Sequence, residues 1–176
     1  MSSGRFNNNN VVEYILHLSQ MEEAARDYCL LIEHLELYTD EQWLADVTRI
    51  LPRIQGSMTN LDDPDIEYSF FCLPDLEERF ELYCRFKDRL GANDSYWLEY
   101  DTGSVNEEMT GSLASDLSDI YFELKRGLNL VESGDANKLD LLRLWQTGYL
   151  LHWSEPLVNA QKHLFSLRTG HRYGLR

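Results

Sequence analysis

The chain has 176 residues, of which 43% are apolar and 12% aromatic, which is enough for a packed core and too much for a disordered acidic tail. Its 16 basic and 30 acidic side chains give a formal net charge of −14, which argues against general affinity for nucleic acid or anionic lipid because phosphate groups would repel it. No apolar run approaches the ~18 residues of a membrane-spanning helix, and the N-terminal ten residues lack the apolar stretch of a signal peptide.

Apolar side chains of the N-terminal part recur every three or four residues, the spacing that places them on one face of an α-helix. After a flexible segment at 1–10, this spacing predicts a long helix over 11–38. Thr39 and Gln42 have the spacing of a capping box, so a second helix should follow at once. Its apolar pattern continues past Pro52, which predicts a kink there rather than an end. Because the connection between the two helices is short, they should pack antiparallel.

The helical spacing is lost from about residue 60 and returns near Pro74. Proline is well tolerated at the first position of a helix, so we expect a third helix to begin there. Gly91 is placed to stop this helix, because glycine readily adopts the left-handed conformation that follows a helix end. The aromatic stretch 94–103 has no helical period and predicts either a packed loop or one short extended segment.

Two further helices are predicted over 106–133 and 136–167. Pro156 lies within the second of these patterns and should kink that helix. A flexible tail over 169–176 follows. The predicted fold is therefore all-α: one domain over 11–168, a helical bundle of four long helices plus a shorter one, with mostly antiparallel neighbours.

Most of the negative charge lies in the middle of the chain. Residues 60–108 hold 4 basic and 14 acidic side chains, a net charge of 4 − 14 = −10, against −5 for residues 1–59 and +1 for residues 109–176. Such a run is compatible with a solvated face, and the functional alternative is an acidic surface that steers a basic partner protein. The candidate partner-binding residues are Tyr96, Trp97, Asp62, Asp63 and Asp65.

The fourth predicted helix carries three carboxylates along one stripe, because Asp116, Asp119 and Glu123 are spaced by three and then four. Like charges at this spacing repel, so a nearby group should offset them. Three arrangements remain open: an interhelical ion-pair seam, a site for a divalent cation completed by His152, and an ordinary surface. His152 could alternatively be half-buried beside a core tryptophan, donating to Asp116, to Asp119 or to a carbonyl freed by Pro156.

Cysteine and motif patterns give no catalytic residue. Cys29, Cys72 and Cys84 are an odd number without CxxC spacing, which indicates neither a disulfide nor a zinc ribbon and suits a reducing, cytoplasmic environment. The five histidines form no HExxH pair, and the glycine-rich phosphate-binding loops are absent. We therefore expect no cofactor, apart from the divalent cation that the carboxylate stripe could hold.

The stretch 111–128 resembles the signature of an uncharacterised bacterial family, domain of unknown function 5063. The later His152-Trp153 pair is similar to the start of a His-Trp-Gly segment of that family, and the similarity is strongest over 111–165. The resemblance implies a compact, all-helical domain and no assigned activity. The residues of the first stretch that match the family pattern directly are Asp116, Asp119, Ile120, Tyr121, Leu124, Lys125, Gly127 and Leu128.

Three functions remain open from the sequence. The concentrated charge and the lack of a complete catalytic set favour a non-enzymatic helical protein that binds another protein, as an adaptor, an inhibitor or an immunity-type factor. The first alternative is a metal-assisted hydrolase that holds Mg²⁺, Mn²⁺ or Zn²⁺ with the stripe and His152. The second alternative is a purely structural oligomer.

Overall fold

The computed structural model describes residues 8–59, 76–98 and 109–173. Helices dominate these segments, so the predicted all-α class is confirmed, with one short β-hairpin added. The first two segments begin with α1 (Asn8–Glu33), a single 3-10 turn η1 (Leu35–Leu37), α2 (Asp40–Thr59) and α3 (Leu76–Leu90). The remaining elements are the 3-10 turn η3 (Gly91–Asn93), β1 (Ser95–Leu98), β2 (Met109–Ser112), α4 (Leu113–Glu132), α5 (Lys138–Gly148), the π turn η4 (Tyr149–Trp153) and α6 (Ser154–Tyr173).

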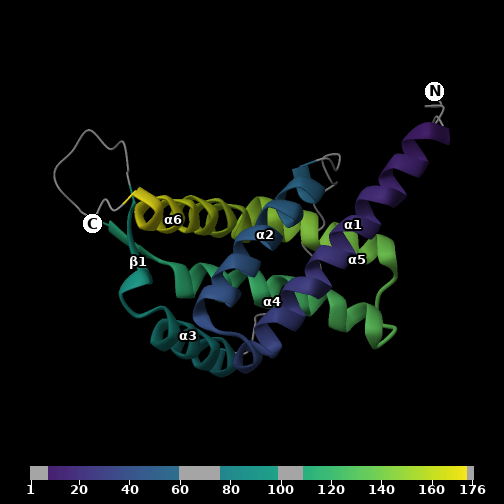
Figure 1. The fold of residues 1–176 in the computed structure, drawn as a ribbon. Coiled ribbons are helices and arrows are strands. Elements are labelled where there is room, and N and C mark those ends of the chain that lie inside the picture. Colours follow the sequence, from purple (N-terminus) through teal and green to yellow (C-terminus); the bar gives the residue numbers. More distant parts are fainter. Residues whose placement is uncertain (1–7, 60–75, 99–108, 174–176) are drawn as a thin grey trace.

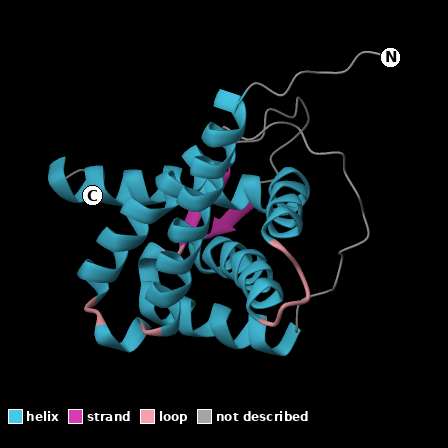
Figure 2. Cartoon of the chain, turned by 90° about the vertical axis from the view of Figure 1, so that its right-hand side faces the viewer, coloured by secondary structure: helices cyan, strands magenta, loops and turns pink. Residues whose placement is uncertain are grey.

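Helix α4 lies at the centre of the bundle. It packs against α1, α3, α5 and α6, while α1 and α2 form a neighbouring pair and α6 also contacts α2 (Figure 1). Helix α2 returns beside α1 in the opposite direction, as their short connection predicts. The short hairpin lies at one end of the bundle, beside the C-terminal end of α6 (Figure 1), and the two strands are seen behind the helices in Figure 2.

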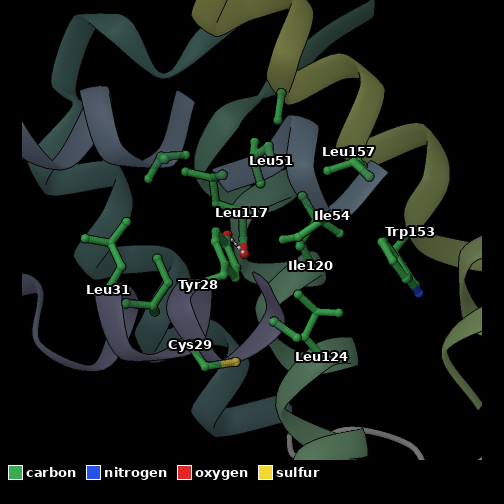
Figure 3. Packing of buried hydrophobic residues seen from close by; sticks show 14 of the residues in the cluster. Tyr28, Cys29, Leu31, Leu51, Ile54, Leu117, Ile120, Leu124, Trp153 and Leu157 are labelled. Atoms are coloured by element: carbon green, nitrogen blue, oxygen red, sulfur yellow. Dashed lines mark hydrogen bonds between the residues drawn. The ribbon is translucent and has the colours of Figure 1, made fainter. Parts of the chain in front are cut away.

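The core forms where the apolar faces of these helices meet (Figure 3). Leu117 and Ile120 of α4 and Trp145 of α5 are completely buried, as their spacing predicts. Tyr28 of α1 is also fully buried, and its hydroxyl donates to the backbone carbonyl of Leu117 at 2.9 Å, so the one polar atom of this side chain is satisfied. Removing such large apolar side chains from water supplies the main driving force for folding.

The ends of the N-terminal helices differ from the prediction. Helix α1 begins at Asn8, inside the segment expected to be flexible, and it ends at Glu33 rather than near residue 38. The chain tightens into η1 after this point, where Arg89 of α3 donates to the backbone carbonyls of Leu35, at 2.9 Å, and of Tyr38. Carbonyls near the end of a helix lack an intrahelical N–H partner, and Arg89 supplies donors to two of them.

The middle of the chain agrees with the prediction where it is described. Helix α2 continues through Pro52, and the capping box holds, since Thr39 and Gln42 each accept from the other's backbone N–H. Helix α3 ends at Leu90, and Gly91 has a positive φ of 52°, as expected for a helix stop. Its expected start at Pro74, like Cys72, lies outside the described residues.

Residues 109–112 form strand β2, which corrects the predicted helix over 106–133. Ser95–Leu98 takes the extended alternative, and the two strands pair antiparallel with Ser95 opposite Ser112. The backbone of Ser112 is extended, at φ −132° and ψ 117°, and its side-chain oxygen accepts from the backbone N–H of Ser115. Ser112 is therefore the N-cap of α4, and a helix cannot extend upstream through it.

The predicted fifth helix is interrupted by the π turn η4, so the irregularity lies about one turn before Pro156. Proline at this position cannot donate to the carbonyl of His152, and its ring would collide with that carbonyl in a regular helix. A π turn opens the backbone at this point and lets the chain continue in nearly the same direction. Helix α6 then runs to Tyr173, so the predicted flexible tail from residue 169 is helical to that residue.

Candidate functional site

A polar cluster joins the hairpin to the start of α4. Asp94, which is 2% exposed, accepts from the backbone N–H of Ala114 at 2.8 Å and from the hydroxyl of Ser112 at 2.9 Å. Its own carbonyl accepts from the backbone N–H of Leu113 at 2.9 Å. These contacts satisfy N–H groups that the first turn of a helix leaves unpaired. Asp94 could not be identified as a cap from the sequence, because a residue so far along the chain from the helix start has no local spacing signal.

Tyr96 connects the hairpin to two helices. It pairs across the strands with Gly111, and its ring occupies the space over that glycine, where an added Cβ would lie 2.2 Å from the ring carbon Cζ. Its hydroxyl donates to Oδ2 of Asp116 on α4 at 2.5 Å. The ring stacks on the imidazole of His163 on α6, with centroids 4.8 Å apart, and Nε2 of His163 lies 2.7 Å from the carbonyl oxygen of Asn93.

Asp116 has an unusual acidity for a carboxyl group. Burial raises its pKa from the ordinary 3.8 to about 7, and the carboxylates of Asp119, Asp94 and Glu155 push it in the same direction, while the hydrogen bond from Tyr96 opposes the rise. Burial and the neighbouring Asp116 raise the pKa of the Tyr96 hydroxyl as well, so it stays protonated. A carboxyl that titrates near neutrality can serve acid–base chemistry, and structural clusters also produce one.

The other two carboxylates of the stripe have separate partners. Asp119 accepts from Nε and Nη2 of Arg79 on α3, at 2.8 and 2.5 Å, and this contact is an interhelical ion pair. Glu123 accepts from Arg126 on its own helix at 2.9 Å. Each carboxylate of the stripe thus has its own partner, and the partner of Asp116 is the hydroxyl of Tyr96.

His152 is more exposed than the sequence predicts. It lies in η4 with its side chain exposed, whereas the sequence favoured a half-buried position, because the neighbouring Trp153 takes the inward-facing place in this turn. Within the described segments, no three His, Cys, Asp or Glu side chains come together as they would around a metal ion. Asp116, Asp119, Glu123 and His152 are therefore not assembled as ligands of one cation.

The two candidate aromatic anchors lie on opposite sides of β1, because successive side chains of a strand alternate. Tyr96 points into the bundle, and Trp97 is 65% exposed. Trp97 is therefore the more exposed of the pair. The remaining candidates, Asp62, Asp63 and Asp65, lie outside the described residues.

A family model for a domain of unknown function (DUF5063) matches residues 13–170 of the chain. The chain belongs to this family. The match confirms the resemblance of the segment 111–165 and extends it across all the helices. The DUF5063 domain accordingly includes both the polar cluster and the face that carries Trp97.

A solved structure shows the same fold. Protein BF1032 from Bacteroides fragilis, known from a crystal structure, superposes with a TM-score of 0.71 at 21% sequence identity, covering 86% of this chain and 91% of that one. No curated protein matches the chain. None of the helices in the described segments is both long and apolar enough to cross a membrane.

Proposed function

We propose that this DUF5063 protein works by binding another protein, in an adaptor, inhibitor or immunity-type role, and that Trp97 is the main anchor. The observation that carries the proposal is the 65% exposure of Trp97 on a firmly held strand. Tyr96, the next residue, is fixed by Asp116 and by the stacked His163. Tryptophan is enriched among the residues that dominate binding energy, and a preordered anchor loses little entropy when it binds.

The charge of the chain indicates the class of partner. Residues 60–108, which include β1 and α3, carry a net charge of −10. Glu77, Glu78 and Glu81 of this segment lie exposed on α3. Acidic side chains on the surface would attract a basic protein and speed association at low salt, while an exposed aromatic anchor would govern dissociation.

The test compares the wild-type protein with Trp97→Ala in affinity capture from the host at low and high salt, followed by binding measurements with the purified partner. We expect a stoichiometric basic partner that the wild type retains at low salt and releases at high salt. The Trp97→Ala variant should bind it at least about tenfold more weakly. Leu139→Ala is the matched control, since Leu139 is a large apolar residue of α5 that is 45% exposed. Equal binding by Trp97→Ala and the wild type would contradict the proposal.

A further inference from the structure

Helix α6 has an apolar stripe on the side away from the core. Its inward face is formed by Trp153 at the preceding turn and by Leu157, Ala160 and Leu164, all of them buried. The helix packs on α4 and α2 along one edge of the bundle (Figure 1). A line of exposed side chains seven residues apart begins in η4 and continues along the helix: Leu151 (43% exposed), Val158 (47%) and Phe165 (67%).

An acidic residue and a basic residue flank the middle of this stripe. Glu155 lies on one side of Val158 along the helix and Lys162 lies on the other, and both side chains are exposed. At 100° per residue, the two fall on the same edge of the stripe. Leu151 and Phe165 are each seven residues from Val158, whereas Glu155 is three residues before it and Lys162 is four residues after it. The stripe is therefore arranged nearly symmetrically about Val158, apart from a reversal of charge.

We propose that this face of α6 binds the same face of a second copy of the chain, antiparallel, with a two-fold axis near Val158. The axis places Val158 against its counterpart and Leu151 against Phe165 of the other copy. It also places Glu155 of each copy beside Lys162 of the other, which gives two reciprocal ion pairs. Self-complementarity of this kind is what a two-fold interface requires.

The charges favour this orientation over a parallel one. In a parallel pairing the two-fold axis runs along the helices, so the edge that carries Glu155 and Lys162 in one copy lies on the opposite side of the interface from the same edge of the other copy, and the two reciprocal ion pairs cannot form. This preference follows from the order of the charges along the helix. It is independent of Trp97, which lies on β1.

The size of the face predicts a weak dimer. The stripe from Leu151 to Phe165 spans about 20 Å of helix. A single helix face of this length presents less surface than the ~800 Å² per partner of a stable interface. The dimer should therefore dissociate on dilution, and its population should rise with protein concentration.

Charge reversal tests the proposed register. Sedimentation velocity over a range of concentrations, at low salt, compares the wild type with Glu155→Lys, with Lys162→Glu and with the double variant. Each single variant places like charges at both reciprocal contacts, so the dimer dissociation constant should rise about fivefold or more. The double variant restores both pairs with reversed sign and should return the constant to near its wild-type value. Surface charge reversal leaves the core intact, and circular dichroism confirms the fold of each variant.

A second comparison tests the apolar stripe. Val158→Asp should abolish the dimer, because two carboxylates would meet at the axis, whereas Leu139→Asp on α5 should leave it unchanged. A wild-type protein that stays monomeric at all concentrations would overturn the proposal. A dimer that is insensitive to Val158→Asp, or one that the double charge reversal does not restore, would overturn it too. Trp97→Ala should leave self-association unchanged, so failure of partner binding and failure of the dimer can be told apart.

Discussion

The hydroxyl of Tyr96 donates a hydrogen bond to Oδ2 of Asp116 at 2.5 Å, and this contact fastens the hairpin to the central helix of the bundle. The carboxyl that accepts it is only 8% exposed and has three other carboxylates, those of Asp119, Asp94 and Glu155, close enough to raise its pKa. A buried negative charge among other negative charges is costly. The position therefore favours a protonated carboxyl, which can accept the same hydrogen bond without that cost.

Replacing Asp116 with asparagine should increase stability at alkaline pH. The folded protein has a pKa of about 7 at this carboxyl, against 3.8 as the ordinary value, so between the two values it binds a proton that the unfolded chain has released. The free energy of unfolding must therefore fall as pH rises from about 4 to about 7. The introduced amide keeps an acceptor for Tyr96 and removes the charge. We expect Asp116→Asn to be about 2 kcal/mol more stable than the wild type at pH 8 and nearly equal to it at pH 4.

Urea unfolding at pH 4, 5.5, 7 and 8 measures this difference. Asp88→Asn, a change at an exposed carboxylate on α3, is the control and should leave the pH dependence as it is in the wild type. If the difference in free energy of unfolding between Asp116→Asn and the wild type were constant across this range, the pKa of Asp116 would be the same in the folded and the unfolded protein.

The helices could be predicted from the sequence because each has a repeating apolar face. The positions of Leu117, Ile120 and Trp145 follow from spacing alone, and all three are buried. The hairpin could not be predicted in this way, because the connection between the paired strands is much longer than the two-residue turns that mark a hairpin in a sequence. Met109 also fits the helical pattern of the residues that follow it, which extended the predicted helix too far upstream.

The candidate site was predictable only in part, for a related reason. The spacing of Asp116, Asp119 and Glu123 correctly places them along α4. Their partners come from other elements, such as Tyr96 on β1 and Arg79 on α3, and sequence spacing carries no information about such tertiary contacts. The sequence thus predicts which charged residues share a face of a helix. It does not predict which groups on other elements pair with them.

Helices α4 and α5 approach closely at Gly127, which should not tolerate a side chain. An added Cβ there would lie 2.5 Å from Nε1 of Trp145 and 2.6 Å from Cδ1 of Leu141, and both of these side chains are buried. Gly127→Ala should therefore lower the free energy of unfolding by about 2 kcal/mol, because the ring of Trp145 has to move within a packed core.

Gly56 provides the matched control for this substitution. It also lies within a helix, α2, but a Cβ placed on it would meet no atom within 4 Å. Gly56→Ala should raise the free energy of unfolding by about 0.5–1 kcal/mol, since alanine is the better helix former and restricts the unfolded chain. Urea unfolding of the two variants should give changes of opposite sign, and a stabilised Gly127→Ala would contradict the packing described.

Cys29 should be unreactive in the folded protein. It is 3% exposed, and burial raises the pKa of its thiol to about 12, so almost none of it is thiolate at neutral pH. The test counts thiols with a chromogenic disulfide reagent at pH 8, for the wild type and for Cys29→Ala. The two should give equal counts when folded and should differ by one thiol in concentrated urea. A lower count for folded Cys29→Ala would show that Cys29 is accessible.

The ion pair of Arg79 with Asp119 should couple α3 to α4 by a modest free energy. Two guanidinium nitrogens contact one carboxylate oxygen, at 2.8 and 2.5 Å, but each side chain is about one-third exposed, at 32% and 34%. Solvent therefore screens the pair, and a double-mutant cycle with Arg79→Ala and Asp119→Ala should give a coupling of about 0.5–1 kcal/mol.

The variant Asp119→Ala should also change the pH dependence of stability, because it removes a negative neighbour of Asp116. The pKa of Asp116 in the folded protein should fall, so the decrease of the free energy of unfolding with rising pH should end at a lower pH. Arg79→Ala leaves the charge of Asp119 in place and unpaired, so it should not lower that limit. If both single variants lowered it equally, the cause would be a loss of α3 packing rather than the charge of Asp119.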